Sequence, residues 1–130
     1  MCLYTDYKTP IIATEPIRVW KRLLPTGAVK ANEIIYMTPY QHIWVRVDET
    51  LKGLFPNEEV RESINLKKYI VSAQGVHAYI SRNDAEINKC SYEIITEWEI
   101  PAGAKYWIGT GYSGDEIAAT EMKFIKVCED

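Results

Sequence analysis

The feature that most constrains the fold of this chain is the alternation of apolar and polar residues, which recurs in short segments along its length. A period of two is typical of a β-strand that buries one face. The clearest segment is residues 92–100, where the apolar residues share one side and the glutamates the other: Tyr92, Ile94, Trp98 and Ile100 against Glu93, Glu97 and Glu99. The sequence therefore predicts a protein made mainly of strands.

Similar patterns predict further strands at residues 17–23, 33–37, 41–47, 69–73, 76–80, 105–108, 116–119 and 122–127. Residues 25–27 and 101–103 combine proline and glycine and predict turns. Residues 1–15, punctuated by a proline, predict an irregular N-terminal arm. The glycine-rich residues 109–114 predict a mobile loop that connects a hairpin.

Helices are fewer. Asp48 can cap a short helix that ends before Pro56, and residues 57–68 fit either a helix or a surface loop. Ser81 and Asp84 are placed to cap a short helix that reaches about Lys89. We therefore expect a single α+β domain over residues 1–130: a curled mixed or antiparallel sheet, with a split β-sandwich as the alternative form, and two or three short helices.

Composition bounds the function. The chain has 130 residues, of which 47% are hydrophobic and 25% charged, as in an ordinary soluble domain. A formal net charge of −3 disfavours binding to bulk nucleic acid. Three widely spaced cysteines and two distant histidines indicate neither a metal site nor a disulfide framework. With no signal peptide and no long apolar span, we expect a cytoplasmic location and no membrane contact.

The most informative pattern is on the polar sides of three predicted strands, where cations stand beside flat aromatic rings. These residues are Arg18, Trp20 and Arg22; His42, Trp44 and Arg46; and His77, Tyr79 and Ser81. If the three sides coincide, they form a face that suits an anionic ligand with a stackable ring, such as a nucleotide. The alternative stays open: the rings form a second core layer beneath a helix, and the arginine stems cover apolar surface.

Individual residues give weaker signals. His77 stands beside Gly75 and fits a packed core histidine better than a general base, because no serine or cysteine has a nucleophile's spacing. The glycines of residues 103–114 lack the Gly-x-Gly-x-x-Gly pattern of a phosphate loop. Asp115 and Glu116 follow the predicted loop, where an acid is either solvated or a catalytic or ribose-binding carboxylate.

Residues 75–81 combine a glycine, an aromatic residue and a serine ahead of a short predicted helix. They resemble the glycine–aromatic–serine strand and the core helix of the ADP-ribosyltransferase family. Residues 93–103 are similar to its strand ending in an Ile-Pro-x-Gly turn, and residues 116–119 and 122–127 to its closing pair of strands. Residues 19–22 resemble its opening strand. The whole chain also resembles short proteins of gut bacteria and their phages.

The ADP-ribosyltransferase resemblance implies NAD as the cofactor and a nicotinamide cleft. Glu116 would polarise the ribose hydroxyl, Lys21 or Arg22 would contact phosphate or ribose, and Tyr79 would stack on nicotinamide. The sequence departs from the family pattern at Gly114, where a second acid is expected, and only Ser81 lies near the position of its Ser-Thr-Ser triplet. These departures favour the fold without the transferase activity.

Our leading hypothesis is therefore a non-enzymatic binding module for a nucleotide-like or anionic ligand. Its ligand-binding residues would be Lys21, Arg22, Trp20, Trp44, Arg46, His77, Tyr79 and Ser81, with no metal. An NAD-dependent ADP-ribosyltransferase, or a degenerate relative with Glu116 as its catalytic residue, is the second hypothesis. A structural or assembly protein, related to those of phages, is the third.

Overall fold

The computed structural model describes residues 3–6, 9–30, 33–37, 44–46, 50–52, 61–63, 68–71, 76–111 and 114–128. Its elements, in chain order, are β1 (Leu3–Thr5), β2 (Ile11–Ile12), β3 (Ile17–Lys30), β4 (Glu33–Met37), β5 (Trp44–Arg46), β6 (Thr50–Lys52), β7 (Arg61–Ser63), β8 (Lys68–Val71), β9 (Val76–Tyr79), α1 (Arg82–Asn88), β10 (Ile94–Ile100), β11 (Lys105–Gly111), β12 (Gly114–Ala119) and β13 (Glu121–Val127). Strands dominate, as the alternation predicts.

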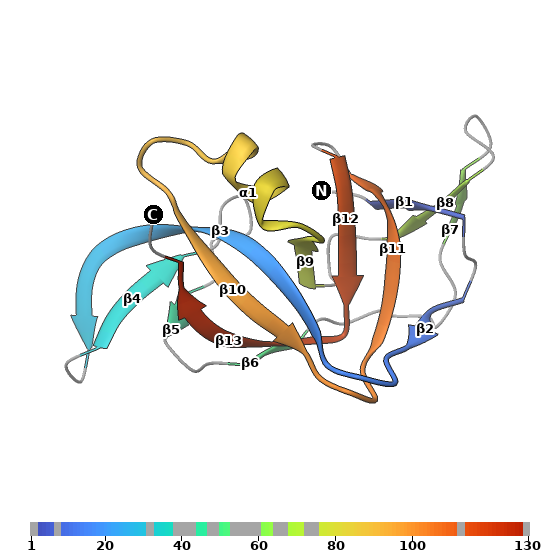
Figure 1. Ribbon diagram of the computed structural model, residues 1–130, viewed down its shortest axis with the longest axis horizontal. Coiled ribbons are helices and arrows are strands. Elements are labelled where there is room, and N and C mark those ends of the chain that lie inside the picture. Colours follow the sequence, from blue (N-terminus) through green and yellow to red (C-terminus); the bar gives the residue numbers. More distant parts are fainter. Residues whose placement is uncertain are drawn as a thin grey trace.

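The described strands join into one curled antiparallel sheet that forms half a barrel (Figure 1). Its main path runs in the order β6-β13-β10-β3-β9-β12-β11-β1-β8-β7, while β4 extends from β3 and carries β5, and β2 pairs with β11. The curled antiparallel form is therefore observed, in place of the split β-sandwich. The long strand β3 curves through the left and middle of the view in Figure 1 and lies between β10 and β9 on this path.

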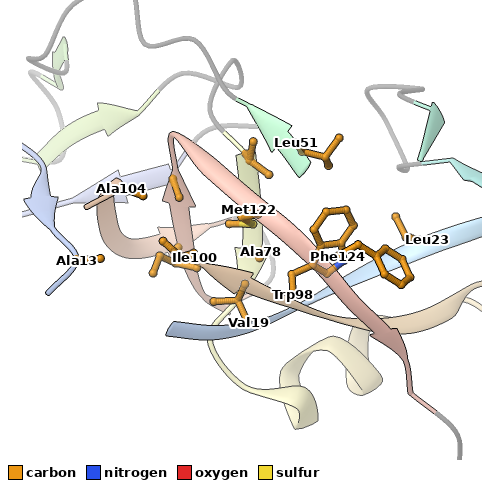
Figure 2. Close-up of a cluster of buried hydrophobic side chains, with 13 residues drawn as sticks. Ala13, Val19, Leu23, Leu51, Ala78, Trp98, Ile100, Ala104, Met122 and Phe124 are labelled. Atoms are coloured by element: carbon orange, nitrogen blue, oxygen red, sulfur yellow. The ribbon is translucent and has the colours of Figure 1, made fainter. Parts of the chain in front are cut away.

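One face of the sheet carries the hydrophobic core. Val19 and Leu23 of β3 lie on this face with Trp98 and Ile100 of β10, and all four side chains are fully buried. Phe124 of β13 meets the Trp98 ring edge-on at 5.1 Å between centroids, a geometry that favours aromatic pairs. Figure 2 shows these side chains gathered on one side of β3 and β10. The predicted alternation is confirmed for Ile94–Ile100, but Tyr92 is exposed and Glu93 buried, and both precede the strand.

Helix α1 lies on the other face. Its buried Ala85 packs against Tyr79 of β9 and Ile95 of β10, and in Figure 2 the helix and the core side chains lie on opposite sides of β3 and β10. Ser81 is the N-cap, and its hydroxyl oxygen accepts a hydrogen bond from the Asp84 backbone N–H at 3.1 Å. The prediction that Ser81 caps this helix is confirmed. The face of the sheet opposite the hydrophobic core therefore carries a second, smaller apolar layer beneath α1.

The other predicted helices are not confirmed, since α1 is the single helix among the described residues. The helix after Asp48 is wrong at Thr50–Lys52, which form β6 and pair with β13. Only Leu51 of these three is buried, so a strand that buries one residue satisfies the segment. The helix interpretation of residues 57–68 is wrong at Arg61–Ser63, which form β7 and pair with β8; residues 53–60 and 64–67 lie outside the described part.

Three further expectations need correction. The N-terminal arm contributes β1 and β2 to the sheet, where Thr5 is fully buried and its hydroxyl donates to the Ile108 carbonyl oxygen at 2.7 Å. The turn expected at residues 25–27 is instead part of β3: Pro25 pairs with Tyr36, and the register shifts between Pro25 and Val29. Proline, which lacks an N–H, is tolerated in a sheet at such an irregularity.

The predicted loop at residues 109–114 is mostly strand, because β11 and β12 extend to the pair Gly111 and Gly114; the hairpin itself is confirmed. Gly109 is required there: a Cβ atom would lie 2.0 Å from the backbone oxygen of Tyr4. The predicted turn at 101–103 is confirmed, with Gly103 at a φ of 91°, a conformation that favours glycine. Within the described residues, no helix has the length and apolar character needed to cross a membrane.

Candidate functional site

The predicted site residues gather where β3 meets β9 and β12. Trp20 of β3 lies directly opposite Tyr79 of β9, which lies opposite Glu116 of β12. Residues directly opposite each other in antiparallel strands project from the same face. Trp20, Tyr79 and Glu116 therefore form one row across three strands, on the face that α1 occupies. We call this row and its flanking residues Arg18, Lys21 and Arg22 the seam site.

The contact between β3 and β9 is slight. The described pairing between these two strands is the single pair Trp20 and Tyr79, whereas β3 and β10 are paired continuously from Ile17 to Leu23. A continued ladder would bring the next residues of β3 against His77. Instead, the ammonium group of Lys21 donates a hydrogen bond to the His77 backbone oxygen. The lysine side chain thus replaces part of the ladder at the seam.

Lys21 has an unusual position for a cation. Alternation along β3 places it on the core face with the buried Val19 and Leu23, beside Thr96 of β10. The Thr96 hydroxyl donates to the backbone oxygen of Lys21 at 2.9 Å. Burial lowers the pKa of Lys21 to about 8 from 10.5, against the attraction of the Glu116 carboxylate and with the help of the Arg22 charge. Lys21 and Glu116 are therefore close enough to influence each other's charge.

Arg22 lies on the face of the sheet that α1 covers, and its guanidinium group is held by hydrogen bonds. Its guanidinium donates to the Glu93 carboxylate at 3.1 Å and to the Asn88 backbone oxygen at 2.8 Å, and it stands over the Tyr79 ring at 5.8 Å from the centroid. Glu93 also accepts a hydrogen bond from the Cys90 backbone N–H at 2.7 Å. Arg22 therefore joins β3 to the end of α1 and fixes the Tyr79 ring.

Burial distinguishes the members of the seam site. Glu116, Tyr79, Lys21 and Arg22 are 3%, 5%, 9% and 9% exposed. Trp20 is half-buried, and Arg18 is exposed. The described packing around Tyr79 is thus the second core layer that the sequence left open as an alternative. The accessible part of the site is the Trp20 side, where Arg18 contacts the Glu97 and Glu99 carboxylates at 3.4 and 3.6 Å.

The remaining predicted site residues divide into two groups. His77 is buried on β9, and Ser81 is occupied as the α1 cap. Trp44 and Arg46 lie in β5, which reaches β3 only through β4, and β4 pairs with residues of β3 that follow Leu23. Their side chains, and the whole of His42, lie outside the described residues. The structure therefore brings together Trp20, Lys21, Arg22, His77, Tyr79 and Glu116.

Glu93 is a site residue that the sequence reasoning missed. It holds Arg22 at 3.1 Å and is 4% exposed. Alternation placed it on the polar side of the strand at 92–100, but no pattern signals its contact with a strand more than 70 residues earlier. Among the described residues, no group of three or more histidine, cysteine or acidic side chains could hold a metal ion.

Comparisons of this chain with protein-family models, with curated proteins and with solved structures found no match.

Proposed function

We propose that this chain is a non-enzymatic binding protein for a small anionic molecule with a flat ring, such as a nucleotide, held at the Trp20 side of the seam site. The observation that carries the proposal is the order of side chains on one face of β3. The half-buried Trp20 lies between Arg18 and Arg22 and opposite Tyr79. An indole face stacks on a base, and a guanidinium group binds phosphate oxygens in pairs.

The two arginines have different parts in this proposal. Arg18 is 48% exposed on its side chain, and its carboxylate contacts are long. Exposed ion pairs of this kind contribute about 0–1 kcal/mol, so a phosphate group can replace them at small cost. Arg22 stays bound to Glu93 and keeps the Tyr79 ring in place. The site is thus fixed at its base and adaptable at its edge, as in a preorganised site.

The test is calorimetric titration with AMP, NAD and inorganic phosphate, together with thermal unfolding. A ligand that binds only the folded chain raises the melting temperature by mass action. We expect AMP to raise it, and Arg18→Met to weaken AMP binding by about tenfold, equal to about 1.4 kcal/mol. Lys52→Met is the matched control: it removes one positive charge from β6, which β13 and β10 separate from β3.

Absence of binding by all three compounds contradicts the proposal. Equal weakening by Arg18→Met and Lys52→Met also contradicts it, because net charge alone would then explain the effect. A cytoplasmic location, where nucleotides are abundant, belongs to the same proposal.

One observation favours a second candidate, NAD-dependent ADP-ribosyl transfer or a degenerate form of it. Glu116 lies opposite Tyr79, and the Glu116 charge raises the pKa of Lys21 against the larger effect of burial. These residues are the ones to which the family resemblance assigns roles. If this function holds, the wild type releases nicotinamide from NAD, and Glu116→Gln loses that release while the exposed Glu86→Gln keeps it. Chromatography of nicotinamide measures both, and equal rates in wild type and Glu116→Gln exclude the role.

A further inference from the structure

The indole N–H of Trp20 is a buried donor that meets no acceptor among the described residues. The ring packs against the cluster of Tyr79, Ala85 and Ile95, and the N–H is shielded from water. A buried polar group without a partner loses its hydrogen bond to water and gains nothing in return. The unliganded arrangement around Trp20 therefore carries a free-energy cost.

Trp98 shows what the fold provides where a buried indole needs an acceptor. Its N–H donates to the Thr96 hydroxyl oxygen at 2.8 Å, and the same hydroxyl donates in turn to the Lys21 backbone oxygen at 2.9 Å. Trp98 is fully buried on the core face, and its hydrogen bonds continue into β3. The two tryptophans lie on opposite faces of the same pair of strands. Only Trp20 belongs to the face with the exposed Arg18.

We propose that an anionic oxygen of the bound molecule accepts the hydrogen bond from the indole N–H of Trp20. This inference rests on the proposed function and adds to it a residue that selects the ligand. The face of the Trp20 ring stacks on the flat ring of the ligand, and the N–H at its edge donates a hydrogen bond to an anionic oxygen. Because the N–H is buried in the described arrangement, this hydrogen bond requires the half-buried indole to turn when the ligand binds. The anion that Arg18 attracts is thereby also bound by a neutral donor.

The chemistry of the occupant follows. A molecule with a flat ring and no anionic oxygen can stack on Trp20 but offers the N–H at most a neutral acceptor. A molecule with a phosphate or carboxylate oxygen satisfies both. Since a hydrogen bond to a charged acceptor is stronger than one to a neutral acceptor, the site distinguishes AMP from adenosine. Arg18 and Trp20 contribute separately to that distinction.

The test compares AMP with adenosine on the wild type, on Trp20→Phe and on a chain with 3-benzothienylalanine at position 20. The last of these has nearly the shape of tryptophan with sulfur in place of N–H, so it keeps the packing if Trp20→Phe fails to fold. Calorimetry should show AMP binding weakened about tenfold in the sulfur isostere, and adenosine binding changed by less than about threefold. Thermal unfolding without ligand should show no loss of stability in the isostere, because the N–H has no partner to lose.

Other results would contradict the proposals, each in a different way. If both compounds bind the isostere as they bind the wild type, or both weaken equally, Trp20 does not donate to the anion, and the proposed binding function still stands. If AMP, NAD and inorganic phosphate all fail to bind the wild type, the proposed function is wrong and this inference falls with it. If AMP alone fails to bind, only this inference is wrong.

Discussion

Lys21 makes a structural hydrogen bond between two strands and also places a positive charge in the core, where burial disfavours the charged form. Its ammonium completes the seam by donating to the His77 backbone oxygen, yet it is buried among core residues. Its position was readable in the sequence, since it stands between Val19 and Leu23 in an alternating segment. Its partner was not readable, because the contact depends on β9 lying next to β3 with a single residue pair.

A pH titration of stability tests this residue. The pKa of Lys21 falls to about 8 in the folded chain from 10.5, so between these values the unfolded chain binds a proton that the folded chain does not. Stability therefore rises with pH over that window. We expect the wild type to gain up to about 3 kcal/mol between pH 8 and pH 10.5 relative to Lys21→Met, measured by urea unfolding.

Groups shared by wild type and Lys21→Met cancel in this difference. The exposed Lys52→Met serves as the control and should follow the wild-type curve. Parallel curves for wild type and Lys21→Met would show that the lysine is charged and solvated alike in both states.

At the scale of elements, predictability from sequence follows the length of each pattern. The strand at 92–100 was predicted because it alternates over most of its length, and β10 (Ile94–Ile100) buries Trp98 and Ile100 on the expected side. Strands β6 and β7 have three residues each, too few for a period to show. Asp48 as a possible cap favoured a helix over β6, and residues 57–68 fitted either a helix or a loop around β7. The continuation of β3 past Pro25 depends on β4, a tertiary partner that no local pattern names.

Helix α1 has seven residues and depends on its ends more than a long helix does, because isolated short helices are unstable in water. Ser81→Ala removes the oxygen that accepts the Asp84 N–H and should lower the free energy of unfolding by about 1 kcal/mol. Ser91→Ala, in the exposed turn after the helix, should change it by less than about 0.5 kcal/mol. Urea unfolding measures both, and equal effects would contradict the capping role.

At the scale of the molecule, the half-barrel is held together by strands that are distant in sequence. β1 lies between β11 and β8 in the sheet, with Tyr4 opposite Thr110 on one side and Ile70 on the other. The overall class, a strand-dominated α+β domain, could be predicted because it follows from summed local patterns. The order of strands could not, because it depends on which edges meet after folding.

Removal of residues 1–6 tests that arrangement. Without β1, strands β11 and β8 each lose a partner and the buried Thr5 is lost. We expect the free energy of unfolding to fall by more than about 2 kcal/mol, measured by urea unfolding, with removal of residues 129–130 as the control. An unchanged midpoint in urea would mean that β1 contributes nothing to the sheet.

The position of β1 in the sheet also determines when β1 can complete its pairing during synthesis of the chain. Ribosomes extend a chain at about 5–20 residues per second, and the residues that flank Tyr4 on its β11 side are about a hundred positions downstream. The first-made strand must therefore wait several seconds, without one of its neighbours, until the hairpin of β11 and β12 emerges. During that interval its backbone groups on the β11 side are unpaired, and arrest of translation before β11 is made would leave an exposed strand edge that is prone to aggregation.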